Sequence, residues 1–211
     1  MAELVIDTTM GFAQIALKTP QSKIYVKKTA CDNNQAEKIA VLLQNILLEA
    51  QVEFNDITKI YCLIGPGSFT GIRVSIAFIK GLLIGKNIKI IAIPNFYFFI
   101  SNIVNKIPKY QSIKILIDCG KNKSEFFFLD ISTDLSALSS PKIITYDDAK
   151  NMVNKNNLII GNFNKNFFPD NNRNNIISTP YESLDIKNIF SLPPFSPNYN
   201  FSPLYIRNSY A

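Results

Sequence analysis

Short apolar segments separated by polar turns fill the first thirty positions of the chain. Residues 4–6 are apolar, residues 12–17 alternate, and residues 23–28 form a third strand-like segment. This spacing is typical of antiparallel strands joined by small turns. Asp7 directly follows the first segment, a position common in folds that bind phosphate and metal. It is also a plain turn signal, because Asp bonds its own backbone, and the residues favour the turn.

The next stretch changes to a helical period. Between residues 36 and 50 apolar side chains recur every three and four positions, which predicts a helix that Asn33 or Asn34 caps. Its apolar arc is wider than one core face needs. A strand at 60–64, a second helix at 72–84 and a strand at 89–94 follow. Strands that alternate with helices favour parallel pairing and an α/β fold.

The second half repeats this alternation in a shorter form. Turn chemistry at 106–109 predicts a boundary between a domain at 1–108 and a smaller domain at 109–211 with an extended, Pro-rich tail. Both halves contain a strand that ends in an aspartate, Asp7 and Asp118, which suggests a duplicated fold. The expected elements are helices at 95–105, 147–154 and 185–190, strands at 113–118, 125–130, 142–145 and 158–162, and a loop at 162–175.

A glycine-rich turn joins the strand at 60–64 to the second helix. Its spacing, G-x-G-x-x-x-G, fits neither the dinucleotide fingerprint nor the Walker A loop. We expect a structural loop in which Gly65 and Gly67 adopt turn angles that other residues avoid, and in which Ser68 or Thr70 caps the helix. An anion site formed by the backbone N–H groups stays open as the alternative. The loop consists of Gly65, Gly67, Ser68, Thr70 and Gly71 with the residues between them.

The helix at 72–84 is apolar around nearly its whole circumference. A helix of this kind is buried on all sides. One side must face the sheet, and the other needs cover from the rest of the chain or from another subunit. The wide apolar arc of the helix at 36–50 makes a bundle with a second subunit an equal alternative to burial within one chain.

Residue content excludes several kinds of chemistry. The 211 residues include no histidine, and the three cysteines, Cys31, Cys62 and Cys119, lie far apart. A zinc site and any mechanism with a Ser–His or Cys–His pair are therefore not expected. No motif predicts a cofactor or another metal. Cys62 and Cys119 lie in apolar segments typical of small core residues.

The chain has a net charge of +6 and 47% hydrophobic residues. A basic surface favours nucleic acid or acidic partners, although abundant Lys, Asn and Ile also follow from a biased gene composition. No uncharged apolar run is long enough to span a membrane, and the N-terminus has no basic segment of the signal-peptide type. We expect a cytoplasmic protein.

Residues 65–73, GPGSFTGIR, followed by an apolar helix with Lys80, Gly81 and Leu82, resemble the TsaB (YeaZ) family. Matches to the same family follow in order along the chain. They are IDTT at 6–9, IAIP at 91–94, the segment between Asp118 and Phe127 that keeps Asp118 and Glu125, and PLYIR at 203–207.

The resemblance implies a two-lobed fold of the actin/Hsp70/sugar-kinase type, each lobe built on a ribonuclease-H-like sheet. Members of this family do not catalyse alone but pair with the related catalytic subunit TsaD and work with the ATPase TsaE. The complex transfers a threonylcarbamoyl group from its adenylate to the adenosine beside the anticodon of tRNA. TsaD holds its metal with paired histidines, and a chain without histidine agrees with a scaffold that has lost this site.

The resemblance and the two apolar helices lead to the same expected interface, because the family is similar in using these helices to dimerise, with itself or with TsaD. The residues expected to form it are Ile39, Leu42, Leu43, Ile46, Ile72, Ile76, Ile79 and Leu83. Contact with tRNA is expected through the complex, and direct contact by this chain is left open.

Two other functions compete with the scaffold. The first is a small phosphotransferase that uses Asp7 and the glycine loop at 65–71, although the lobes are short and no second phosphate loop is evident. The second is a peptidase, which the lack of histidine and of a paired nucleophile and base disfavours.

Overall fold

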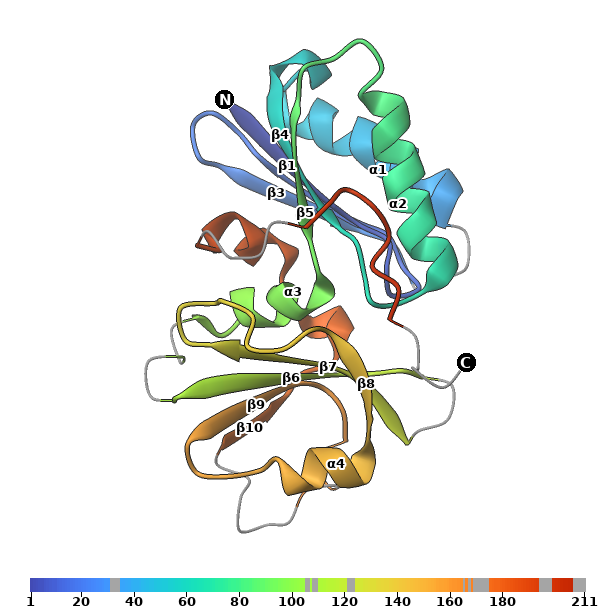
Figure 1. Cartoon of the computed structure of the whole chain (residues 1–211). Coiled ribbons are helices and arrows are strands. Elements are labelled where there is room, and N and C mark those ends of the chain that lie inside the picture. Colours follow the sequence, from blue (N-terminus) through green and yellow to red (C-terminus); the bar gives the residue numbers. More distant parts are fainter. Residues whose placement is uncertain are drawn as a thin grey trace. The chain divides into compact units, whose positions relative to one another are not determined.

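The fold is that of a computed structural model, which describes residues 1–30, 35–104, 107, 110–120, 124–164, 166, 168, 175–193 and 199–206 (Figure 1). The predictions that involve Cys31, Asn33, Asn34, the turn residues Lys106 and Pro108, and Arg207 lie outside these residues. The described part of the chain forms two compact units. Within that part, no helix has both the length and the apolar character needed to cross a membrane.

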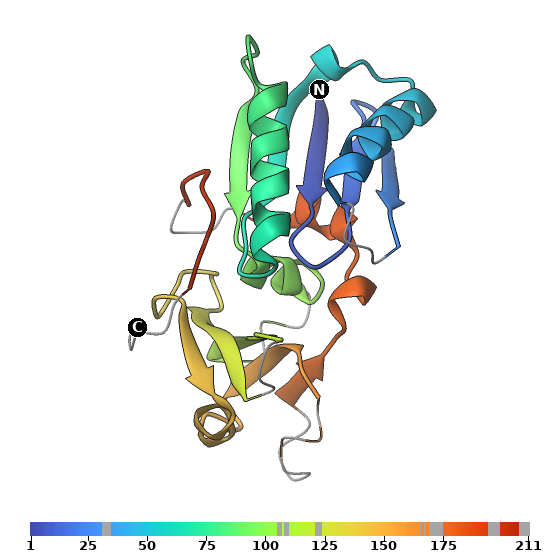
Figure 2. The same cartoon turned by 90° about the vertical axis from the view of Figure 1, so that its right-hand side faces the viewer.

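The first unit is a five-stranded sheet with two long helices. Its strands lie in the order β3-β2-β1-β4-β5, with β1, β2 and β3 antiparallel and β1, β4 and β5 parallel. Helices α1 and α2 cover the same face of this sheet (Figure 2). The elements are β1 (Ala2–Asp7), β2 (Gln14–Lys18), β3 (Ile24–Lys28), α1 (Gln35–Ala50), η1 (Phe54–Asp56), β4 (Ile57–Leu63), α2 (Phe69–Leu82) and β5 (Lys89–Ile93).

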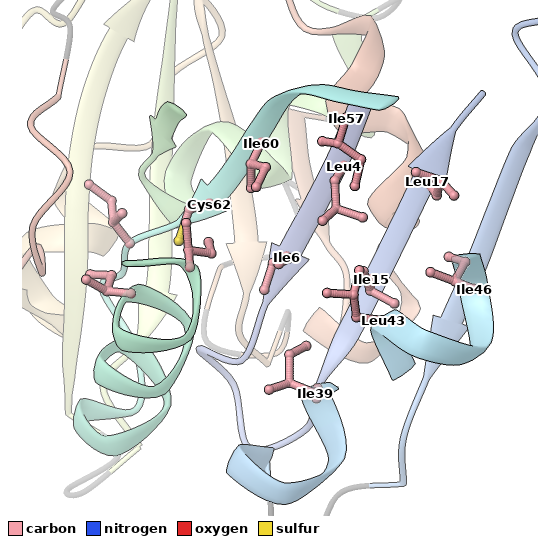
Figure 3. Close-up of a cluster of buried hydrophobic side chains, with 14 of the residues drawn as sticks. Leu4, Ile6, Ile15, Leu17, Ile39, Leu43, Ile46, Ile57, Ile60 and Cys62 are labelled. Carbon is pink, nitrogen blue, oxygen red and sulfur yellow. The ribbon is translucent and has the colours of Figure 1, made fainter. Parts of the chain in front are cut away.

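The core of this unit lies between the sheet and the two helices. Alternate strand residues such as Leu4, Ile6 and Ile15 point toward α1, and Ile39 and Leu43 of α1 point back at them (Figure 3). Branched aliphatic side chains fit both surfaces, because they are stiff and pack well on a pleated sheet. Full burial of each such side chain contributes about 1.5–3 kcal/mol.

Two later segments complete the first unit. The 3₁₀ helix η6 (Ile186–Ser191) packs on the sheet face opposite α1 and α2, where the ring of Phe190 meets Tyr61 edge to face at 5.9 Å. Residues 199–204 contact β5 at one end and the residue after β4 at the other. Tyr199 forms a bridge with Ala92, and the Leu204 N–H donates to the carbonyl oxygen of Ile64 at 2.8 Å. We call residues 199–204 the strap.

The second unit holds another five-stranded sheet, in the order β10-β9-β6-β7-β8. Its core gathers Leu116, Phe126 and Ile159 from the strands with Ala149 from α4. Thr145 caps α4 and completes a capping box with Asp148. The elements are β6 (Ser112–Asp118), β7 (Glu125–Ser132), β8 (Lys142–Thr145), α4 (Tyr146–Asn151), β9 (Asn157–Asn162), β10 (Ile176–Ser178) and η5 (Tyr181–Ser183), while α3 (Asn95–Ser101) leads from the first unit into this one.

The two sheets share one topology, as a duplicated fold requires. Each has three antiparallel strands and then two parallel strands on the other side of the first one. The aspartates at the strand ends are not equivalent, however. Asp7 alternates away from the helix-facing Leu4 and Ile6, whereas Asp118 lies on the same side of β6 as Leu116, which packs with α4. The duplication therefore concerns the backbone more than these side chains.

Most predicted elements are present with shifted ends, and three short ones in the described part of the chain were missed, the 3₁₀ helices η1 and η5 and the strand β10. The strand β10 follows the Asn-rich stretch and was not expected, because three residues are too few for a periodic pattern. The first unit comprises Met1–Phe98, Asp185–Leu192 and Tyr199–Leu204, so it takes in segments from the last part of the chain. The boundary expected at residue 108 falls outside the described residues.

Candidate functional site

The glycine loop meets the turn after β1 backbone to backbone. The Ser68 N–H donates to the Thr9 carbonyl oxygen at 2.7 Å, and the Thr8 hydroxyl donates to the Gly71 carbonyl oxygen at 2.5 Å. A Cβ on Gly71 would overlap the Thr8 carbonyl oxygen, and a Cβ on Gly67 would overlap that of Thr9. These two glycines are therefore needed for a close approach between two segments. Gly67 is not among the glycines with a positive φ, so the special turn angle expected for it is corrected to a requirement for space.

The start of α2 is fixed from within the loop. Ser68 is the N-cap, and its hydroxyl accepts from the Gly71 N–H at 3.2 Å, which confirms one of the two predicted caps. Thr70 lies in the first turn of the helix and is exposed. Gly65 has a φ of +105°, in the region that favours glycine, as the sequence predicted for this position.

A buried polar network lies beneath the loop. The Asp7 carboxylate accepts from the Thr9 N–H at 2.8 Å, the Thr9 hydroxyl at 2.7 Å and the Gln14 side-chain amide at 2.8 Å. The Asn95 amide donates to the Thr9 hydroxyl at 2.6 Å and to the Pro66 carbonyl oxygen at 2.9 Å. All four polar side chains are buried. Hydrogen bonding offsets the cost of burying polar groups. The network thereby links β1 and the turn after it to the loop and to α3.

The network changes the interpretation of Asp7. Both carboxylate oxygens are engaged by the chain itself, and the loop lies on the carbonyl groups of Thr8 and Thr9. The geometry is that of a structural junction rather than of an open phosphate cradle. Neither Gln14 nor Asn95 stands out in the sequence, and an Asn at the start of a helix is typical of a simple cap.

The structure places the expected interface residues in two groups. Six of them belong to the core between the helices and the sheet of their own chain, namely Ile39, Leu43, Ile46, Ile72, Ile76 and Ile79. The other two, Leu42 and Leu83, are half-buried. These six are core residues rather than interface residues, because side chains that face the sheet are not available to a partner. The centre of each apolar arc faces the sheet, and any surplus lies on its flanks.

Other apolar side chains of the two helices are exposed. Val41 and Leu48 lie two turns apart on α1, and the side chain of Leu48 is 70% exposed. Ile84, just beyond the end of α2, is 81% exposed. Phe69 at the start of α2 is also exposed on one side, and the Arg73 guanidinium lies 3.7 Å from its ring centroid. We call Val41, Leu48, Phe69 and Ile84 the outer apolar residues.

Cys62 is buried in the core, as the sequence predicted, whereas Cys119, just after β6, is half-buried rather than a core residue. Burial raises the pKa of the Cys62 thiol to about 12, and the nearby Asp7 carboxylate acts in the same direction. Burial also raises the pKa of Cys119 to about 12, with Glu125 and Asp118 adding to the effect. Neither thiol is a thiolate near neutral pH, so neither is a ready nucleophile or metal ligand. Among the described residues, no group of three or more Cys, Asp or Glu side chains is arranged to hold a metal ion.

The chain forms two α/β units of one topology, and its glycine loop is closed by contacts with its own backbone. These features define a protein of the two-lobed class to which YeaZ belongs. A protein from Pseudomonas aeruginosa described as similar to the peptidase YeaZ superposes with a TM-score of 0.70 at 15% identity, over 98% of this chain and 99% of that one. YeaZ from Pseudomonas aeruginosa itself superposes with a TM-score of 0.58 at 17% identity, over 69% of this chain and 68% of that one. The fold class expected from the sequence is confirmed.

The model of the family described as "TsaD: tRNA N6-adenosine threonylcarbamoyltransferase" matches residues 26–139. The chain is 26% identical over 136 residues to the tRNA threonylcarbamoyladenosine biosynthesis protein TsaB of Buchnera aphidicola subsp. Baizongia pistaciae, which covers 64% of this chain and 60% of that protein. It is 29% identical over 93 residues to TsaB of Escherichia coli K12, which covers 44% of this chain and 40% of that protein. The chain belongs to this family, and within it to the TsaB (YeaZ) proteins.

Proposed function

We propose that the chain takes part in the biosynthesis of threonylcarbamoyladenosine in tRNA, as a subunit that has no active site of its own. In this proposal it binds a TsaD-like catalytic subunit through the outer surfaces of α1 and α2. The names of its relatives support the pathway. The observation that carries the binding role is the presence of large exposed apolar side chains on the two adjacent helices that already cover the sheet.

These outer apolar residues have a composition typical of an interface. Leu48 and Ile84 are among the most exposed large hydrophobic side chains of the described residues. Burying each one against a partner contributes about 1.5–3 kcal/mol. The aromatic ring of Phe69 with its stacked Arg73 adds the residue types that dominate interface energetics. A set of this kind supports a contact between subunits more than a solvated surface.

Gly81 supports the same surface. It lies within α2, where glycine is less favourable than alanine by about 1 kcal/mol. A Cβ at this position would meet nothing within 4 Å in the described chain, so no contact within the chain requires glycine there. A partner helix that passes close to α2 would require it, because a glycine lets two backbones approach.

The partners proposed for the complex follow from the family. A TsaD-like subunit would supply the catalytic site, and a TsaE-like ATPase would join the larger assembly. A second copy of this chain would use the same surface when the catalytic subunit is absent, and tRNA would be bound by the complex. The alternative function, a small phosphotransferase, is less favoured, because the Asp7 carboxylate is buried and hydrogen-bonded within the chain.

The test is co-purification with the TsaD-like chain encoded in the same genome. Leu48→Asp combined with Ile84→Asp introduces two charges that pairing would desolvate, and we expect association to weaken at least about 100-fold. The matched control is Leu138→Asp, since Leu138 is 57% exposed in the second unit and lies on neither helix. The surface assignment fails if the double variant co-elutes with its partner as the control does.

A second measurement separates the pathway from the surface. In cells that lack the gene for this chain, we expect mass spectrometry to show loss of threonylcarbamoyladenosine from tRNA. The wild-type chain should restore the nucleoside, and the double variant should not. Normal modification in the deleted cells would refute the pathway whatever the result of the co-purification.

A further inference from the structure

The hairpin formed by β2 and β3 carries positive charge without any acidic residue. Residues 8–31 include Lys18, Lys23, Lys27 and Lys28 but no Asp or Glu. The ammonium group of Lys27 pairs with Glu49, which comes from α1. The hairpin and Glu49 together therefore carry a net positive charge, and three of the four lysines lie in or next to β3. Such a surface attracts acidic ligands.

The strand β3 ends the sheet on this side. In the part of the chain that the structure describes, β3 pairs only with β2. The opposite end of the sheet is different, because Tyr199 of the strap forms a bridge with Ala92 of β5. The chain itself therefore occupies part of this sheet edge. The outward N–H and C=O groups of an edge strand such as β3 are a template for a further strand.

Backbone directions show which residues offer these groups. The Lys23 carbonyl oxygen accepts from the Thr19 N–H, and the Thr29 N–H donates to the Ala13 carbonyl oxygen, both at 2.9 Å. These two bonds lie just beyond either end of the paired part of β2 and β3, and both involve odd-numbered residues. Because the directions alternate along a strand, the N–H and C=O groups of the even-numbered residues between them point to the outer edge.

Two of these even-numbered residues, Ile24 and Val26, have exposed apolar side chains, and the third is Lys28. Tyr25 packs against the core and Lys27 pairs with α1, so the odd residues face the helices. Ile24 and Val26 therefore lie on the other face, where they are 37% and 43% exposed. Exposed apolar side chains next to free backbone groups are what a strand-addition site presents, since the backbone gives affinity and alternate side chains give specificity.

We propose that β3 is a docking edge that takes an extended acidic segment of a partner protein as a sixth strand of this sheet. The acidic character follows from the charge of the hairpin. The same lysines oppose pairing of β3 with β3 of a second copy, because like charges would then lie opposite one another. The inference is independent of the proposed function, since it uses a different edge of the unit from the outer surfaces of α1 and α2.

The probe is a capped peptide of alternating Glu and Val, about seven residues long, which spans the five residues of β3 with one to spare at each end. Amide chemical shifts and hydrogen exchange of the ¹⁵N-labelled full chain report binding residue by residue. We expect the peptide to shift the amides of Ile24 and Val26 and to slow their exchange. A peptide with Lys in place of Glu serves as the charge control, and a short oligouridine as the nucleic-acid control.

Two variants at one position test the backbone contribution. Val26→Pro removes an outward N–H, and an edge strand tolerates proline when that N–H faces solvent. We expect it to weaken peptide binding at least about tenfold, the effect of one lost hydrogen bond in a short interface. Val26→Thr keeps the N–H and the branched shape, and we expect it to bind as the wild type does. Lys18→Glu with Lys23→Glu should weaken binding and flatten its salt dependence.

The proposal is overturned if millimolar acidic peptide leaves the β3 amides unchanged, or if the lysine peptide binds equally well. It is also overturned if oligouridine displaces the peptide and the β3 amides keep their exchange rates, because the surface would then bind nucleic acid. Should Val26→Pro fail to fold, slowed amide exchange at residues 24 and 26 of the wild-type chain still supports the proposal, and unchanged exchange refutes it.

Discussion

Replacing Gly71 by alanine tests whether the glycine loop is a structural junction. The added methyl group would lie on the Thr8 carbonyl oxygen, and it would also come within 3.3 Å of the Ser68 Cβ. The loop and the turn after β1 must then move apart by roughly an ångström. Two hydrogen bonds hold these segments together, from Ser68 to Thr9 and from Thr8 to Gly71. Both are expected to break or lengthen.

The size of the effect follows from these contacts. Leaving a buried donor or acceptor without its partner costs about 1–3 kcal/mol for each group. Alanine in place of glycine within a helix offsets about 1 kcal/mol of this. We expect the free energy of unfolding to fall by about 3 kcal/mol, a large share of the about 5–15 kcal/mol that a typical domain has.

Gly81→Ala is the matched control, since it makes the same change in the same helix. A Cβ there meets nothing within 4 Å, so the variant should be more stable by about 0.5–1 kcal/mol. Because the chain has no tryptophan, urea unfolding is followed by far-ultraviolet circular dichroism. The junction is refuted if Gly71→Ala is as stable as the wild type, or if both variants change stability in the same direction.

Two further predictions concern buried groups. Burial raises the pKa of Cys62 to about 12 from its ordinary value of 9.0, so the unfolded chain loses the thiol proton at a lower pH than the folded chain. The free energy of unfolding should therefore fall between pH 9 and pH 12, by at most about 1.4 kcal/mol per pH unit. Urea unfolding at pH 8.5 and 10.5 should show a shallower fall for Cys62→Ala, and parallel pH dependences would contradict this origin. In the second unit, Lys114 pairs with Asp130, whose Oδ1 is buried without a hydrogen bond among the described residues. Lys114→Met should cost about 3 kcal/mol, and adding Asp130→Leu should recover most of it; simple additivity of the two changes would count against a coupled pair.

Hydrophobic period locates a helix well but does not say which apolar side chains face the sheet. The pattern 39, 43 and 46 marks the centre of the arc of α1, and the structure buries that centre. Val41 and Leu48 lie on its flanks, from which an apolar side chain does not reach the core. The width of the apolar arc therefore predicted an exposed apolar surface, but most of the residues expected to form it lie at the buried centre of the arc.

The glycine loop shows a second limit of sequence reasoning. Its glycines predicted a tight turn, and Ser68 predicted the cap, because both depend on neighbours in the sequence. What the loop packs against depends on Thr8 and Thr9, about sixty positions earlier. No local pattern encodes that contact. Asn95 was missed for the same reason, since its partners belong to the turn after β1 and to the loop.

The composition of the first unit has a consequence for synthesis of the chain. Phe190 and the strap come from the last part of the sequence, yet they pack on strands made near the beginning. Translation at about 5–20 residues per second takes about 10–40 s for a chain of this size. During this time Tyr61 and the edge of β5 lack their final neighbours. The first unit leaves the ribosome first, but it cannot be completed until the end of the chain is made. We expect chaperones to bind the nascent chain during this interval, because its apolar surfaces are still uncovered.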